Sequence, residues 1–166
     1  MAKTIILSGG RYQATVDDSD FHLLSDFGWN PIVRPNTVYA MRSFRDGELK
    51  GSIFMHRQIM KCPDDMLVDH VNGNGLDNRR CNLRIATSHQ NQLNRKNTKN
   101  RVGFKGVYWD KHRKAFIVRV CNKNLGRFLD PIEAAMVYDA ELLKMGGDFA
   151  KTNLALGLLD VGTYEI

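Results

Sequence analysis

The sequence is poor in cysteine and contains no long apolar run. Its three cysteines, Cys62, Cys81 and Cys121, include no pair at CxxC spacing. An odd number of cysteines, with no pair at this spacing, argues against both a disulfide framework and a structural zinc site. No apolar run approaches the roughly 18 residues that a membrane-spanning helix requires, and the early run TIIL is too short for a signal peptide. We therefore expect a cytoplasmic protein with no membrane partner.

Acidic residues are almost missing from one segment of the chain. Residues 92–127 hold 11 Lys/Arg and a single acidic residue, Asp110. Residues 1–91 hold 11 basic and 10 acidic residues, and residues 128–166 hold 2 and 7. Such a basic block is typical of polyanion binding, although a solvated charged face gives the same count. Aromatic residues within the block favour nucleic acid; they are Phe104, Tyr108, Trp109 and Phe116.

Short strands and turns dominate the predicted structure of the first 96 residues. The segment 30–56 predicts three strands with an Asp-Gly hairpin turn, and residues 55–61 predict a short helix. DMLVDHV (65–71) is a strand candidate, and the Gly- and Asn-rich segment that follows is a long turn. NLRIAT (82–87) is a second strand, and a helix follows through residues 89–96.

The last third of the chain predicts three short strands and one helix. FKGVYWD (104–110), AFIVRVC (115–121) and NLGRFLD (124–130) are strand candidates separated by polar turns. The helix begins after Asp130, with a capping box and Pro at its first position. It carries apolar residues at helical spacing; they are Ile132, Ala135, Met136, Ala140 and Leu143.

The segment 68–96 contains the residue types that hydrolyse phosphodiesters. A histidine can take a proton from water near neutral pH, and a divalent cation held by oxygen ligands offsets charge on the phosphate. Asp69 and His70 are adjacent, Asn82 follows His70 by 12 residues, and Asn91 follows it by 21. A hairpin followed by a helix folded across it would bring these four side chains together.

VDHVNGNGLDNRRCNLRIATSHQNQLNRK resembles the HNH motif of phage and intron-type homing endonucleases, which have the ββα-metal fold. The resemblance implies that His70 is the general base, that Asp69 and Asn91 hold the metal, and that Asn82 braces the loop and orients the histidine. An Asn at the third position favours Mg²⁺ or Mn²⁺ over Zn²⁺, because an amide oxygen is a harder ligand than imidazole. His56, in the upstream MHRQIM segment, is predicted to be structural, and Asn78 to form the turn.

Residues 103–154 resemble the AP2 DNA-binding domain through KGV, LGRF, EAAMVYDAE and the Asn of KTNL. In this family a three-stranded sheet lies in the major groove of DNA, which implies contacts from sheet and turn residues. Those residues are Lys105, Tyr108, Trp109, Lys111, Arg113, Lys114, Arg119 and Arg127. Tyr108 and Asp110 depart from the family pattern, because they stand where plant AP2 domains have basic residues. In the first module Arg79, Arg80 and Arg84 are candidates for phosphate contact or for solvated charges.

The expected fold class is α+β, with two modules. Residues 1–96 would form a β-rich segment and the HNH module, residues 97–102 a linker, and residues 103–155 the AP2-like sheet and helix. Residues 156–166 would be a tail. The expected function is an HNH homing-type DNA endonuclease, monomeric or weakly dimeric, in a phage-infected or bacterial cytoplasm. The alternatives are a catalytically inactive AP2-type DNA-binding regulator and, less favoured, an RNA-binding protein.

Overall fold

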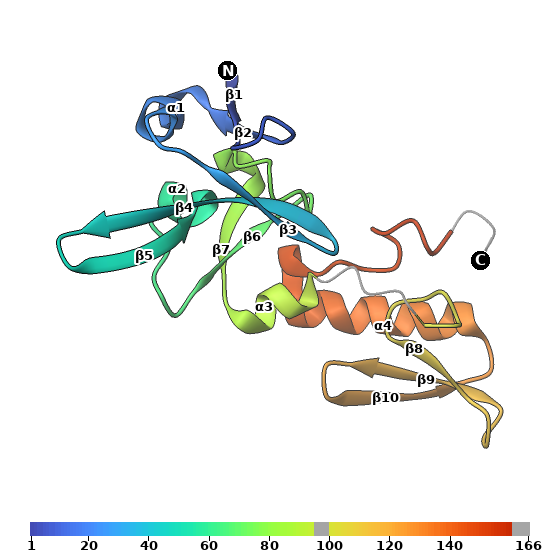
Figure 1. Cartoon of the computed structure of the whole chain (residues 1–166). Helices are drawn as coiled ribbons and strands as arrows, with labels where there is room; N and C mark the ends of the chain where they lie inside the picture. The colour runs from blue at the N-terminus through green and yellow to red at the C-terminus, as the bar shows by residue number, and fades with distance from the viewer. Residues whose placement is uncertain (95–99, 161–166) are drawn as a thin grey trace. The chain divides into compact units, whose positions relative to one another are not determined.

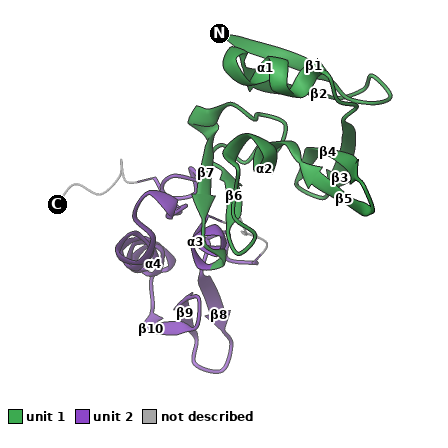
Figure 2. Ribbon diagram, turned by 90° about the vertical axis from the view of Figure 1, so that its left-hand side faces the viewer, with its two compact units in different colours: residues 1–88 green, residues 89–166 purple. Residues whose placement is uncertain are grey.

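A computed structural model describes residues 1–94 and 100–160 (Figure 1). The chain divides into two compact units, residues 1–88 and 89–166 (Figure 2). Both are built from small antiparallel sheets and short helices, as expected for an α+β protein. Among the described residues, no helix combines the length and apolar character needed to cross a membrane.

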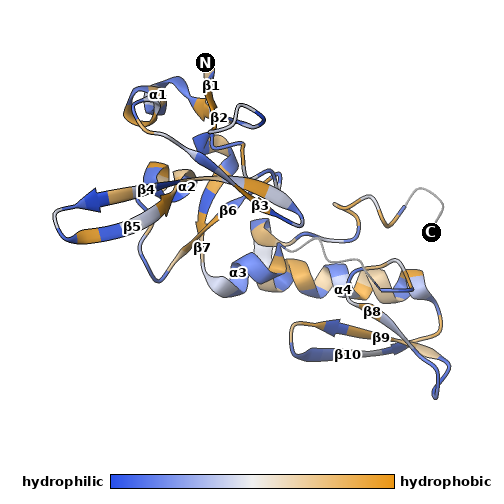
Figure 3. Ribbon diagram, in the orientation of Figure 1, coloured by the Kyte–Doolittle hydropathy of each residue, from blue (hydrophilic) through white to orange (hydrophobic). Residues whose placement is uncertain are grey.

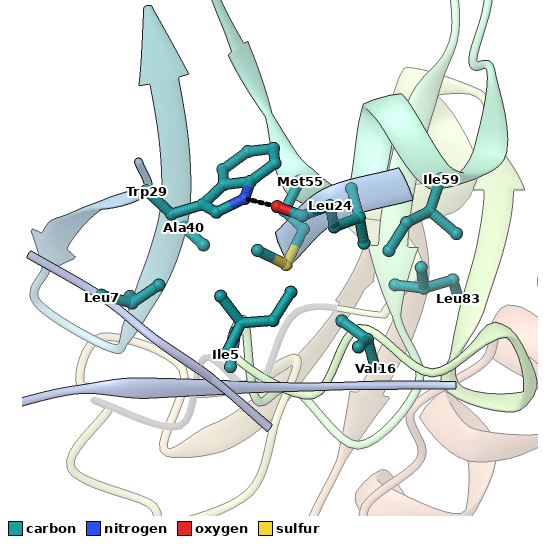
Figure 4. Close-up of a cluster of buried hydrophobic side chains, with 10 residues drawn as sticks. Ile5, Leu7, Val16, Leu24, Trp29, Ala40, Met55, Ile59 and Leu83 are labelled. Carbon is teal, nitrogen blue, oxygen red and sulfur yellow. Dashed lines mark hydrogen bonds between the residues drawn. The ribbon is translucent and has the colours of Figure 1, made fainter. Parts of the chain in front are cut away.

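The first unit opens with a hairpin and a helix. β1 (Ala2–Ile6) pairs antiparallel with β2 (Gln13–Asp17), and α1 (Asp18–Ser25) follows directly. After α1 the indole nitrogen of Trp29 donates to the backbone oxygen of Leu24 at 2.9 Å. This bond lies in the main apolar core of the unit (Figure 4). Its buried members come from segments far apart in the sequence; they are Ile5, Leu7, Ala14, Val16, Leu24, Trp29, Ala40, Met55, Ile59 and Leu83.

A three-stranded sheet follows, in the order β3 (Asn30–Arg34), β4 (Thr37–Asp46), β5 (Leu49–Phe54). The predicted Asp-Gly hairpin turn is confirmed, because Gly47 at the turn has φ +58°.

The segment that positions the candidate site comes next. α2 (Met55–Met60) leads into β6 (Leu67–His70), which pairs antiparallel with β7 (Leu83–Ala86). A 3₁₀ turn, η1 (Arg80–Asn82), precedes β7, and α3 (Ser88–Leu93) follows it. The predicted order of strand, loop, strand and helix is confirmed. Cys81, in the 3₁₀ turn, is exposed.

The second unit contains a three-stranded antiparallel sheet in the order β10 (Lys123–Phe128), β9 (Ala115–Val120), β8 (Val107–Asp110). α4 (Pro131–Gly146) packs on this sheet and is followed by η2 (Gly147–Phe149). Asp130 caps α4 by accepting a hydrogen bond from the backbone nitrogen of Ile132 at 2.8 Å.

The apolar stripe predicted for α4 is partly wrong. Met136 and Leu143 are about half exposed, whereas Tyr138, Asp139 and Leu142 are buried. Apolar and polar residues alternate along the helix (Figure 3), so the hydropathy pattern alone does not set its rotation. A buried carboxylate does so instead: Asp139 accepts hydrogen bonds from the backbone and side chain of Asn153 at 2.7 and 2.9 Å.

Candidate active site

The Asp-His pair lies at the end of β6. Adjacent side chains within a strand point to opposite faces, and the end of a strand relaxes that alternation. His70 is the last residue of the strand. Asp69 and His70 are opposite Arg84 and Leu83 of β7. Both acid and imidazole are buried, with 7% and 5% of their surface exposed. The hairpin therefore takes a carboxylate and a histidine out of bulk water together.

Asn82 spans the loop between the two strands. Its side-chain oxygen accepts from the backbone nitrogen of Asn72 at 3.0 Å, and its side-chain nitrogen donates to the backbone oxygen of Asp77 at 2.8 Å. The Asp77 carboxylate in turn accepts from the Asn72 amide and from the guanidinium of Arg79. These bonds fix the loop in one shape. They are consistent with the bracing role expected of Asn82, while its effect on His70 stays a prediction.

Three side chains contact the His70 ring, those of His56, Tyr39 and Asn78. The ring lies 5.0 Å from that of His56 and 5.8 Å from that of Tyr39, measured between centroids. Its Nε2 atom lies 3.4 Å from Oδ1 of Asn78. Burial lowers the pKa of His70, while the amide of Asn78 and the negative charges of Asp69 and Asp77 oppose that shift. At neutral pH the ring is therefore unprotonated and able to accept a proton.

His56 is more closely tied to the site than its sequence position suggested. Its ring stacks on Phe54 at 5.3 Å and 9°, and meets Tyr39 at 5.5 Å. Burial lowers its pKa to about 3, and the charges of His70 and Arg57 act in the same direction. Its Nδ1 atom has no hydrogen-bond partner in the described part of the chain. The uncharged ring of His56 therefore lines the site. In the sequence only the MHRQIM segment pointed to His56, and no pattern pointed to Tyr39.

The three arginines proposed as phosphate contacts all bind carboxylates. Arg79 pairs with Asp77 at 2.7 Å, and Arg84 pairs with Asp69 at 2.8 Å. Arg80 holds both carboxylate oxygens of Asp20, at 2.7 and 2.8 Å, and also donates to the backbone oxygen of Ile59. Since Asp20 is 4% exposed, the Arg80 guanidinium neutralises a buried charge on α1 and serves the fold.

The predicted metal ligands, Asp69 and Asn91, offer oxygen donors. Within residues 1–94 and 100–160, no group of three or more His, Cys, Asp or Glu side chains is placed to hold a metal ion. Carboxylate and amide oxygens suit a hard divalent cation, and the identity of that cation stays a prediction. Asn91 lies on α3, in residues assigned to the second unit, and its place in the ligand set stays a prediction.

In the second unit most of the predicted DNA contacts are exposed. Strand register places Tyr108, Ile117 and Arg127 side by side on one sheet face, with Arg119 next along β9. That face is opposite the buried Val107 and Val118. The other exposed candidates are Trp109, at the end of β8, and Lys111, Arg113 and Lys114 in the turn after it.

Lys105 does not fit the predicted DNA contact. Its side chain is 6% exposed, and its ammonium group donates to the backbone oxygens of Leu93 and Lys151 at 2.8 and 2.7 Å. Its backbone nitrogen is held by Asn153 at 2.6 Å. Burial lowers the pKa of Lys105 to about 8. Lys105 therefore links two segments of the second unit through its hydrogen bonds.

Comparison with known proteins gives one domain match. Residues 61–93 match the family model described as HNH endonuclease, which confirms the HNH resemblance for that segment. The matched segment includes all four predicted site residues. The chain is also 28% identical over 109 residues to the "Uncharacterized HNH endonuclease L560" of Acanthamoeba polyphaga mimivirus.

That alignment covers 62% of this chain and 58% of the mimivirus protein, so it spans little more than half of that relative's length. No solved structure matches the chain. The HNH match ends at residue 93, and the AP2 resemblance of the second unit stays a prediction.

Proposed function

We propose that the protein is a metal-dependent DNA endonuclease of the HNH type, with His70 as the general base. The observation that carries the proposal is a buried, unprotonated histidine beside a buried carboxylate, inside the segment that matches the HNH family. His70 takes a proton from water, the water oxygen attacks phosphorus, and the bond to the 3′ oxygen breaks. The products are a 3′ hydroxyl and a 5′ phosphate.

A Mg²⁺ or Mn²⁺ ion bound through Asp69 and Asn91 would offset charge on the phosphate and on the departing 3′ oxygen. Arg84 already pairs with Asp69. Its guanidinium lies 2.8 Å from the carboxylate that is proposed to bind the cation. The His56 and Tyr39 rings lie against the His70 ring, and Phe54 packs against both of them.

The face of the β3–β4–β5 sheet that bears Tyr39 is the surface best suited to hold DNA at this site. Residues two apart on a strand share a face, so Tyr39 shares its face with Arg45, and register adds Lys50 opposite Arg45. Arg34, opposite Thr37, lies on the same face. Three cations thus accompany a ring that contacts His70. The outer end of β4 is strongly hydrophilic (Figure 3). We assign phosphate contacts to these cations rather than to Arg79, Arg80 and Arg84.

The exposed face of the β8–β9–β10 sheet would then supply the second DNA contact, in the manner of an AP2 domain. It presents Tyr108, Arg119 and Arg127, and the turn after β8 adds Lys111, Arg113 and Lys114. Such a ribbon fits the major groove of duplex DNA. Homing activity, a phage setting and a monomeric or weakly dimeric state belong to the same proposal.

A catalytically inactive DNA-binding regulator is the competing function. It is favoured by one observation, the pairing of Arg84 with the carboxylate that should bind metal. The two functions differ in a plasmid assay. The endonuclease converts supercoiled plasmid to open circles or linear DNA in Mg²⁺ or Mn²⁺, and EDTA stops it. His70→Ala binds DNA equally but leaves the plasmid supercoiled. Wild-type protein that binds plasmid and never cuts it in either metal would contradict the proposal.

A further inference from the structure

Asn78 is buried in a way that turn formation does not explain. It is 0% exposed, and its φ is not positive. Its backbone nitrogen donates to the backbone oxygen of Thr15 at 2.7 Å, and the nitrogen of Thr15 donates to Leu76 at 2.8 Å. Strand β2 therefore fixes this part of the loop from outside, and the Asn78 side chain points to His70.

The nitrogen of the Asn78 amide costs the fold stability, while its oxygen faces His70. Its Nδ2 atom is buried without a hydrogen-bond partner among the described residues. A buried donor in that state costs about 1–3 kcal/mol. An apolar side chain of similar size would avoid this cost, so the amide is better explained by its contact with the His70 ring.

The two ends of an amide make different contacts with an imidazole. A neutral imidazole has one donor and one acceptor nitrogen, an amide oxygen only accepts, and an amide nitrogen only donates. The structure places Oδ1 of Asn78 3.4 Å from Nε2 of His70. A hydrogen bond between these two atoms therefore requires the ring proton on Nε2 and leaves Nδ1 without one.

We infer that Asn78 is the positioning residue of His70: its Oδ1 atom accepts the Nε2 proton and leaves Nδ1 as the nitrogen that takes the proton from water. This inference rests on the proposed nuclease function. Asn82, expected to orient the histidine, acts one step further away. Its side-chain hydrogen bonds join it to the backbone of Asn72 and Asp77, and they hold the loop that carries Asn78.

The test is the position of the proton on His70 in the intact, ¹⁵N-labelled protein. Long-range proton–nitrogen spectra at about pH 8 give the state of each ring nitrogen, and His70→Gln assigns the signals. The expected result is a protonated Nε2 with a sharp, slowly exchanging proton resonance, and a bare Nδ1. A His70 ring protonated at Nδ1 would overturn the inference, whatever the variants do.

Two variants test the effect of Asn78 on kcat. Asn78→Leu removes the acceptor, and we expect kcat to fall about 10²-fold with little change in KM, together with loss of the Nε2 proton signal. Asn78→Asp keeps an acceptor, and it should retain the signal and restore most of kcat. Asn74→Ser, an exposed position in the same loop, is the matched control. A folded Asn78→Leu protein with wild-type kcat would contradict the inference.

The two proposals fail separately. Wild-type protein with the expected ring protons but no cleavage in either metal would remove the nuclease and leave the position of the His70 ring as inferred. Wild-type protein that cuts DNA with its proton on Nδ1 would remove the role of Asn78 and leave the nuclease.

Discussion

His56 lies between the rings of Phe54 and His70, and burial keeps its imidazole neutral. Its folded-state pKa of about 3 lies below the ordinary value of 6.5, so the unfolded chain binds more protons between these values. The stability of the protein should therefore fall as pH drops from about 6.5 toward 3.

His56→Phe should remove part of that fall, because phenylalanine keeps the ring contacts and does not titrate. Urea unfolding at pH 7 and pH 4.5 measures the free energy of unfolding of both proteins. The difference in favour of the variant should be about 2 kcal/mol larger at the lower pH. The titratable or charged neighbours, His70, Arg57 and Tyr39, are the same in both proteins. An advantage that is equal at the two pH values would show that His56 is not buried neutral.

Arginine roles illustrate what a sequence can and cannot predict about a residue. Local patterns predict that Asp69 and His70 end one strand and that Asn82 begins the next, and the structure has them at the end of β6 and just before β7. The roles of these residues stay predictions. The partners of Arg80 do not, because Asp20 is 60 residues away and only the fold brings the two together. Lys105 was misjudged for the same reason, since its backbone acceptors lie in other segments.

A matched pair of arginine variants separates structural from DNA-contacting cations. Arg80→Ala leaves the buried Asp20 carboxylate unpaired and should lower the free energy of unfolding by about 2 kcal/mol. The folded protein should bind DNA as before.

Arg45→Ala, on the exposed sheet face, should leave stability within about 0.5 kcal/mol. It should weaken duplex binding and lower the slope of log affinity against log salt by about 1. Chemical denaturation and fluorescence anisotropy at several salt concentrations give both quantities. Weaker DNA binding by Arg80→Ala together with lower stability of Arg45→Ala would contradict these assignments.

At the scale of elements, local signals predicted most of what the structure contains. The strand–loop–strand–helix order and the three-stranded sheet with its helix follow from periodicity, turn residues and the cap at Asp130. The rotation of α4 does not, because it depends on Asp139 binding Asn153 across a sequence separation of 14. A polar residue buried by a distant partner contradicts the periodic pattern of its own helix.

Gly106 tests the packing of α4 on the sheet. A Cβ at this residue would lie 1.9 Å from Cε2 of Tyr138, and its φ of +78° already disfavours a side chain. Gly106→Ala should therefore lower the free energy of unfolding by about 3 kcal/mol or more.

Gly103 provides the control for that substitution. It has φ +86° with nothing within 4 Å of a Cβ, so Gly103→Ala should lose only about 1 kcal/mol, the cost of the backbone conformation. Thermal or urea unfolding distinguishes the two. Equal losses would mean that α4 does not press Tyr138 against this turn.

At the scale of the whole chain, charge predicts that the basic block at residues 92–127 binds nucleic acid, which stays a prediction. The boundary between the units was harder to place. The linker was expected at residues 97–102, of which 97–99 lie outside the described residues, and the two compact units divide after residue 88. Leu93 of α3 is buried in the core of the second unit with Val107, Val118 and Leu142. A single apolar residue thus assigns most of this helix to the second unit, and the polar sequence around it gave no sign of that.

The central claim is that His70 drives hydrolysis of duplex DNA, and sequencing of cut ends tests it most directly. Plasmid DNA is incubated with wild-type protein in Mg²⁺ or Mn²⁺, and run-off sequencing on both strands locates every break. We predict breaks with 5′ phosphate and 3′ hydroxyl ends at a defined position in the wild-type reaction, and none with His70→Ala at equal DNA occupancy. Intact DNA in both metals, or the same breaks with His70→Ala, would contradict the account.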